Sequence, residues 1–84
     1  MMLTTGNQLK AARALADMDQ GELARRAGVN INTIGAMEKR GAETLTSGLD
    51  KIKAVMSVLE AEGVEFLNHG QPGVRLRKTA PDAN

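Results

Sequence analysis

The feature that most constrains this chain is a set of four short segments in which apolar residues recur at helical spacing. In the clearest of them the apolar positions fall at i, i+3, i+6, i+7 and i+10, and the charged residues lie mostly on the other side. In chain order the segments carry Leu9, Ala12, Leu15 and Ala16, then Leu23, Ala24 and Ala27, then Ile34 and Met37, and finally Leu49, Ile52, Val55, Met56 and Leu59. The pattern predicts four short helices.

Polar capping residues and glycines predict where these helices begin and end. Side-chain oxygens accept hydrogen bonds from the first turn of a helix, and glycine allows the sharp turn that follows its last turn. The expected N-caps are Thr4 or Thr5, Asp19 with Glu22 three residues on, Asn30, and Thr46 or Ser47. The expected ends are near Asp17, at Gly28, near Lys39 with Gly41 as the stop, and at Gly63.

After Gly63 the period changes from helical to alternating. Residues 64–67 and 74–77 are predicted strands, separated by a turn that is rich in glycine, asparagine and proline. The predicted fold class is therefore mainly α, with four helices followed by a β-hairpin or a pair of strands. We expect one helical domain over 1–63, a C-terminal β segment over 64–78 and a disordered tail over 79–84.

Composition excludes several classes of function. The 84 residues include no Cys, no Trp, no Tyr, one Phe and one His. Without cysteine there is no disulfide framework and no thiolate metal site, and His69 has no second ligand nearby in the sequence. No nucleophile–base pair or phosphate-binding loop is present, so we expect neither an enzyme nor a cofactor. The chain has no membrane-spanning run and no secretory pattern, so a soluble, cytoplasmic protein is expected.

The net charge of +1 conceals an uneven distribution. Residues 1–42 hold six basic and four acidic side chains, residues 43–68 two and five, and residues 69–84 three and one. The local charges are thus +2, −3 and +2. A basic front segment is able to form a positive patch, although ordinary surface charge also explains the distribution.

Residues 20–41 predict two short helices joined by a tight turn around Gly28, which is the arrangement of a helix-turn-helix. Small Ala24 lets the helices cross closely, and Gly28 allows the positive φ that the turn requires. The remaining outer face of the second of these helices is too mixed to be core. It carries Ile31, Asn32, Gly35, Ala36 and Lys39.

At these residues the chain resembles the Xre family of helix-turn-helix proteins, which includes lambda-type repressors and Cro. The likeness covers about residues 6–62 and includes polar residues at fixed positions. The residues that carry it are Leu9, Arg13, Gln20, Leu23, Ala24, Ala27, Gly28, Val29, Thr33, Ile34, Glu38 and Gly41. The ending, with Gly-Val-Glu-Phe-Leu and Pro-Gly-Val-Arg-Leu-Arg, resembles a tail of small bacterial members. The resemblance implies a lambda-repressor-like fold.

The resemblance also implies roles on double-stranded DNA, with the helix over 31–39 in the major groove. Base readout is expected from Asn30, Ile31, Asn32, Thr33 and Ala36, where asparagine suits adenine and the apolar residues suit thymine methyl groups. Backbone contacts are expected from Gln20, Arg13, Lys39, Arg40 and Arg25. Arg13 and Glu38 match an ion pair of the family. Gly35 departs from the family pattern, which indicates a close approach of DNA or another helix, or a weak helix.

The expected function is a sequence-specific transcriptional regulator that binds a two-fold operator as a homodimer. The apolar residues of the strands can bury against the back of the fourth helix, near Leu59, or against the matching segment of a second chain, and the strands can pair within or between chains. The second alternative predicts a dimer interface centred on Phe66 that consists of Leu59, Val64, Phe66, Val74 and Leu76. Such a protein would lie in the cytoplasm and associate with the bacterial nucleoid when bound to DNA. The alternative is an antitoxin-like or other protein-interaction module that retains a helix-turn-helix. Arg75, Arg77 and Lys78 are either a DNA-binding arm or charges that protect a strand edge.

Overall fold

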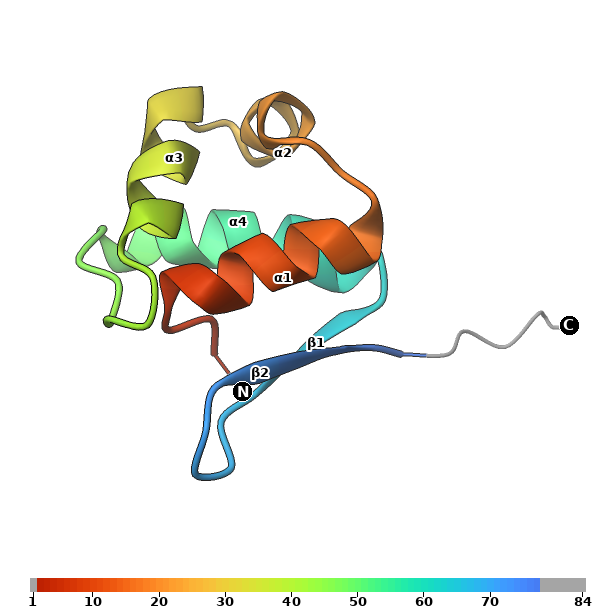
Figure 1. Cartoon of the computed structure of the whole chain (residues 1–84). Helices are drawn as coiled ribbons and strands as arrows, with labels where there is room; N and C mark the ends of the chain where they lie inside the picture. Colours follow the sequence, from red (N-terminus) through yellow and green to blue (C-terminus); the bar gives the residue numbers. More distant parts are fainter. Residues whose placement is uncertain (1, 78–84) are drawn as a thin grey trace, which may run out of the picture.

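Four helices and one antiparallel hairpin make up residues 2–77, the part of the chain that the computed structural model describes. The elements in chain order are α1 (Gly6–Ala16), α2 (Gln20–Ala27), α3 (Ile31–Lys39), α4 (Leu49–Ala61), β1 (Val64–Leu67) and β2 (Gly73–Leu76). The hairpin lies beneath α1 and α4, and α2 and α3 lie above them (Figure 1). The predicted fold class is confirmed. Lys78 and the predicted tail over 79–84 lie outside the described residues.

Three of the four helix starts follow the predicted caps. The side chains of Thr5, Asp19 and Asn30 each accept a backbone N–H of the helix that follows. The prediction that Thr46 or Ser47 caps the fourth helix is wrong, because Gly48 is the N-cap and makes no side-chain hydrogen bond. A side chain at 48 would meet the Asp50 carboxylate, since an added Cβ would lie 2.7 Å from its Oδ1. Because this oxygen ends a flexible side chain that is able to shift, the contact does not explain the cap; the prediction fails because α4 begins two residues after Ser47 and leaves Gly48 at the cap position.

Glycines allow the two turns that set the path of the chain. Gly28, at φ +72°, ends α2, and the N–H of Val29 returns to the carbonyl of Ala24 at 3.0 Å. Gly63, at φ +93°, leads from α4 into β1. Both conformations are left-handed, which side chains other than glycine rarely adopt. These turns place α3 across α2 and direct the hairpin back under the helices (Figure 1).

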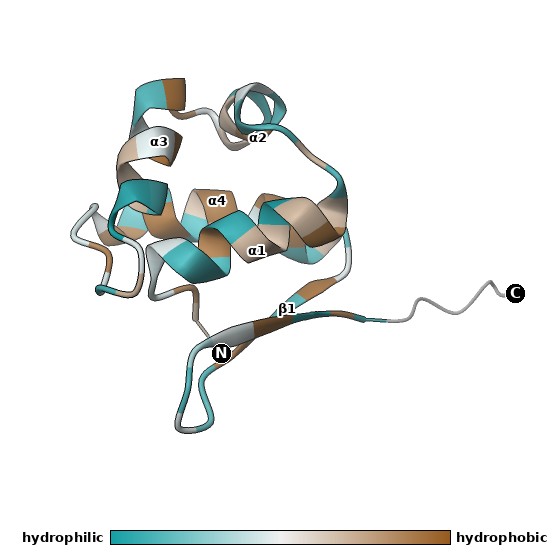
Figure 2. Ribbon diagram, in the orientation of Figure 1, coloured by the Kyte–Doolittle hydropathy of each residue, from teal (hydrophilic) through white to brown (hydrophobic). Residues whose placement is uncertain are grey.

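One hydrophobic core joins the helices and the hairpin. Val64 and Phe66 belong to the same cluster of buried residues as Leu9, Ile34 and Leu59. In β1 the buried Val64 and Phe66 alternate with the half-buried Glu65 and Leu67, so one face of this strand is turned inward. Figure 2 shows the hydropathy of the residues along both strands. The predicted boundary at residue 63 therefore does not separate two cores, and the hairpin is an integral part of the domain.

The predicted dimer interface is wrong at three of its five residues. Leu59, Val64 and Phe66 are 0%, 1% and 2% exposed in the single chain, so they cannot form a surface. The strands pair with each other within the chain, with Val64 opposite Leu76 and Phe66 opposite Val74. The prediction failed because the other alternative holds: α4, together with α1 of the same chain, supplies the apolar cover of the strands. Val74 remains partly exposed and Leu76 is 48% exposed.

Candidate nucleic-acid interface

The helix α3 divides into a buried face and an exposed face, as its sequence predicts. Ile34, Met37 and Glu38 are buried against the rest of the domain. On the other side Asn32, Ala36 and Lys39 are exposed, and Ile31 keeps 49% of its surface exposed. A helix that leaves this mixture of amide, methyl and ammonium groups facing outward offers a binding surface.

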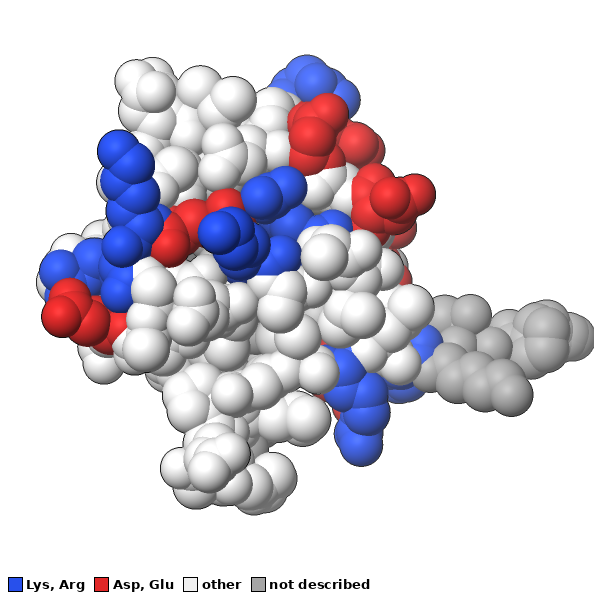
Figure 3. All heavy atoms as spheres, viewed as in Figure 1, with Lys and Arg blue, Asp and Glu red and all other residues white. Residues whose placement is uncertain are grey.

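Three of the five residues predicted to read bases, Ile31, Asn32 and Ala36, line one shallow depression, whereas Asn30 and Thr33 do not. It measures about 410 Å³ and is lined by Gln20, Ile31, Asn32, Gly35, Ala36 and Lys39. The start of α2 thus lies beside the exposed face of α3. Figure 3 shows an uncharged surface over the first half of α3, with basic side chains gathered below it over α1 and the end of α3. Polar and methyl groups in the centre with cations at the border suit a groove edged by phosphates.

Gly35 lines this depression and has no side chain that would fill it. An added Cβ at Gly35 would meet no atom of the described chain within 4 Å. Among the described residues, close packing against another helix is therefore not the reason for this glycine. The two interpretations that remain are a close approach of DNA backbone and a helix that is weak at this point.

An ion pair behind α3 joins this helix to α1. Arg13 donates from Nε to Glu38 Oε2 at 2.6 Å and from Nη2 to Glu38 Oε1 at 3.0 Å. Arg13 Nη1 also donates to the carbonyl of Met18 at 3.0 Å. The Glu38 side chain is 5% exposed and that of Arg13 is 18% exposed. The ion pair expected from the family resemblance is thus present, and it is shielded from water.

The hydrogen bond that Arg13 donates to the Glu38 carboxylate raises the pKa of Arg13 above its ordinary value, and burial of the guanidinium opposes this rise. A raised pKa in the folded protein stabilises the fold at every pH below the pKa of the unfolded side chain. That contribution is lost only as the pH rises through the raised value. Arg13 therefore introduces no pH dependence near neutrality.

Gln20 belongs to the same network. Its Nε2 donates to Glu38 Oε1 at 3.0 Å, so the carboxylate holds the first residue of α2 as well as α1. Since three of the N–H groups of Arg13 have acceptors within the protein, this residue supports α3 from behind. Gln20 lies at the depression, whereas Arg13 does not line it.

The remaining predicted contacts lie at the borders of the surface. Lys39 is exposed at the end of α3, and Arg25 is exposed on α2. Arg40 donates from Nε to the carbonyl of Thr44 at 3.1 Å, which partly restrains its guanidinium. Thr33 is half-buried.

Two polar side chains near the surface are engaged within the protein. Asn30 Oδ1 accepts the N–H of Asn32 at 2.7 Å, so capping occupies its oxygen. Arg26 pairs with Glu62 at 2.9 Å and with Glu22 at 3.5 Å, which raises its pKa chiefly through the Glu62 hydrogen bond. Arg26 thus ties α2 to the end of α4.

Sequence reasoning missed a buried amide that connects the hairpin to α1. Gln8 Oε1 accepts the N–H of Thr5 at 3.1 Å, and its Nε2 donates to the carbonyls of Leu67 and Gly73 at 3.2 and 3.1 Å. Thr5 in turn accepts the N–H of Gln8, so the two form a capping box. The Thr-x-x-Gln spacing is a sequence signal for this box, but nothing local indicates the contacts with the hairpin.

The described residues contain no group of three or more His, Cys, Asp or Glu side chains placed to hold a metal ion. Within that same part of the chain, no helix has both the length and the apolar character needed to cross a membrane. A comparison with models of known protein families and with curated proteins finds no match to this chain. The likeness to the Xre family therefore rests on the residues quoted above.

Proposed function

We propose that the protein is a cytoplasmic, sequence-specific regulator that binds double-stranded DNA through the exposed face of α3. The observation that carries this proposal is the uncharged depression shared by α3 and the start of α2, with Lys39 at its border. Its amide and methyl groups are of the kinds that contact the edges of base pairs. The buried carboxylate of Glu38 joins the two elements that form the surface, since it lies on α3 and accepts the amide N–H of Gln20 at the start of α2.

In this proposal the two halves of the surface have different tasks. Asn32 donates and accepts toward an adenine, and Ile31 and Ala36 contact thymine methyl groups. The amide N–H of Gln20 that is not donated to Glu38 would donate to a phosphate, which the positive end of α2 favours. Lys39 and Arg40 neutralise phosphates at the other end. A homodimer would present two such surfaces about one DNA turn apart, roughly 34 Å.

The alternative, a protein-interaction module, is favoured by one feature of the same surface. Ile31 is 49% exposed and lies beside Ala36, so the centre of the surface is partly apolar. The two functions differ in their dependence on salt. Each neutralised phosphate contributes a slope of about −0.9 to a plot of log affinity against log salt, whereas an apolar protein contact depends little on salt.

The experiment is a selection of binding sites from random double-stranded DNA with the purified protein, followed by titrations across a salt series. We expect one enriched sequence with two-fold character and a steep slope. Asn32→Ala should weaken binding by about 1–3 kcal/mol and relax preference at one base pair of each half-site. Lys39→Ala should weaken binding to all sequences and should make the slope of log affinity against log salt shallower by about 0.9, the contribution of one phosphate.

Lys53→Ala is the matched control, because Lys53 is an exposed lysine on α4, which packs on α1, α2 and β1. This variant should bind like the parent. Sedimentation of the free protein tests the homodimer separately. Absence of any enriched sequence, or equal and sequence-independent effects of Asn32→Ala and Lys39→Ala, would reject the proposed surface.

A further inference from the structure

The outer edge of β2 is an open strand edge. The N–H of Arg77 donates to the carbonyl of Gly63 at 2.6 Å, which makes this a hydrogen-bonded pair of the ladder. Hydrogen-bonded and non-hydrogen-bonded pairs alternate in an antiparallel ladder. Leu76 opposite Val64 and Val74 opposite Phe66 are therefore non-hydrogen-bonded pairs. Their backbone N–H and C=O groups point away from β1, where a further strand is able to bind them.

An apolar groove runs along this edge under α1. Its first part is a depression of about 470 Å³ that Ala11, Ala42, Pro72 and Val74 line together with polar residues at the start of α1. From there α1 and β2 run in the same direction (Figure 1). Leu15 lies four residues after Ala11, about 6 Å further along α1, and Leu76 lies two residues after Val74, about 7 Å further along β2. The two leucines are therefore expected to lie at the same level of the groove. These two residues are 38% and 48% exposed.

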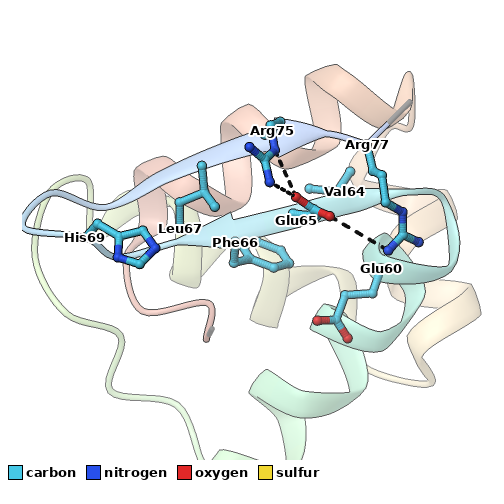
Figure 4. A pocket seen from close by; sticks show the side chains of 8 residues that line it. All are labelled: Glu60, Val64, Glu65, Phe66, Leu67, His69, Arg75 and Arg77. Atoms are coloured by element: carbon cyan, nitrogen blue, oxygen red, sulfur yellow. Dashed lines mark hydrogen bonds and ion pairs between the residues drawn. The ribbon is translucent and has the colours of Figure 1, made fainter. Parts of the chain in front are cut away.

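The opposite face of the strand carries two exposed guanidinium groups, those of Arg75 and Arg77. Arg75 donates from Nε to Glu65 Oε1 at 2.9 Å, and Arg77 lies 3.8 Å from Glu65 Oε2. Figure 4 shows the Glu65 carboxylate between the two guanidinium groups, and Glu60 lines the same pocket. The side chains of Arg75 and Arg77 remain 64% and 61% exposed. Both guanidinium groups are therefore accessible to a further strand beside β2.

We propose that this edge binds an extended segment of a partner protein in which apolar residues alternate with acidic residues. Alternate side chains of an added strand point to opposite faces of the sheet. One set would enter the groove beside Ala11, Leu15 and Leu76, and the other would lie beside Arg75 and Arg77. The backbone groups of Val74 and Leu76 would supply the hydrogen bonds. This surface goes beyond the proposed function, since it includes no residue of α3.

A second copy of the chain fits this edge less well. Pairing Val74 of one copy with Leu76 of the other places Arg75 opposite Arg75, and pairing Leu76 with Leu76 places Arg75 opposite Arg77. Like charges directly opposite each other destabilise a sheet. Pairing Val74 with Val74 avoids this clash, but it places Pro72, which has no N–H, opposite Leu76. An acidic strand meets none of these obstacles.

The test is a titration of the isotope-labelled full chain with a short synthetic peptide of alternating valine and glutamate, followed by NMR. We expect saturable shifts of the backbone signals of β2 and of residues 11–15. A peptide of alternating valine and lysine should bind at least about tenfold more weakly. Arg77→Glu should reverse the preference between the two peptides.

Leu76→Pro removes an outward N–H without removing a hydrogen bond to β1, and should weaken binding about tenfold, as expected for one lost hydrogen bond. Unchanged signals of Val64 and Phe66 would show that the variant keeps its fold. If the signals of Val64 and Phe66 change in Leu76→Pro, the effect of Arg77→Glu on the preference between the two peptides decides the test. The proposal is overturned by the absence of shifts at millimolar peptide, by equal binding of both peptides, or by a dimer in sedimentation that protects the β2 amides from exchange.

Discussion

Glu38→Leu removes the carboxylate that joins α1, α2 and α3. The side chain is 5% exposed, and it accepts two N–H groups from Arg13 and one from Gln20. Loss of one member of a buried ion pair costs about 3–5 kcal/mol, because the other charge stays without a partner. Water reaches part of Arg13, which is 18% exposed, so we expect about 3 kcal/mol. A domain of 84 residues has roughly 4–13 kcal/mol of stability in total.

A double variant separates the lost charge pair from lost packing. Replacing both partners by apolar residues, Arg13→Met with Glu38→Leu, should recover most of the stability, because no buried charge remains. The measurement is urea unfolding followed by circular dichroism, since the chain has no Trp or Tyr. Glu43→Gln, at an exposed pair with Arg40, is the control and should change stability by less than about 0.5 kcal/mol. A double variant as unstable as Glu38→Leu would refute the reasoning.

Three further predictions use the same unfolding measurement. Gly6→Ala should cost about 1–3 kcal/mol, because the added methyl would lie 2.8 Å from the N of Gly41 and 2.9 Å from the O of Glu38; a variant as stable as the parent would contradict this close crossing. Gly35→Ala should instead gain up to about 1 kcal/mol, since its methyl enters open space, and a loss would show a contact that the structure lacks. Gln8→Leu should cost about 1–3 kcal/mol and speed amide exchange of the hairpin before that of α3, because the buried partners of Gln8 lose their hydrogen bonds; uniform acceleration would contradict a local role.

Local signals in the sequence predicted the helices well. Thr5, Asp19 and Asn30 act as caps because their oxygens reach N–H groups only two or three residues away. Gly28 and Gly63 mark turns for an equally local reason, the sign of φ. At Ser47 the same reasoning failed, because the helix begins at Leu49 and its N-cap is Gly48, which has no side chain to accept a hydrogen bond.

Contacts between distant residues were predictable only in part. The pair of Arg13 and Glu38 came from the family resemblance, and no period or spacing indicates it. The burial of Phe66 in its own chain depends on the path of the chain after α4, which places β1 and β2 beneath α1. An apolar strand looks the same in sequence whether its own helices or a second chain cover it. This ambiguity explains the wrong interface.

The hairpin contributes to the orientation of α3 although it lies on the far side of the domain. Gln8 holds the carbonyls of Leu67 and Gly73 and, through Thr5, the cap of α1. A further hydrogen bond joins the start of α1 to the residues just after α3, because the N–H of Asn7 donates to the carbonyl of Gly41 at 2.8 Å. Removal of the strands after Gly63 would uncover the core and leave Gln8 without two acceptors. Truncation at this point would therefore disturb the surface of α3 by loosening its support, even if the strands never touch a ligand.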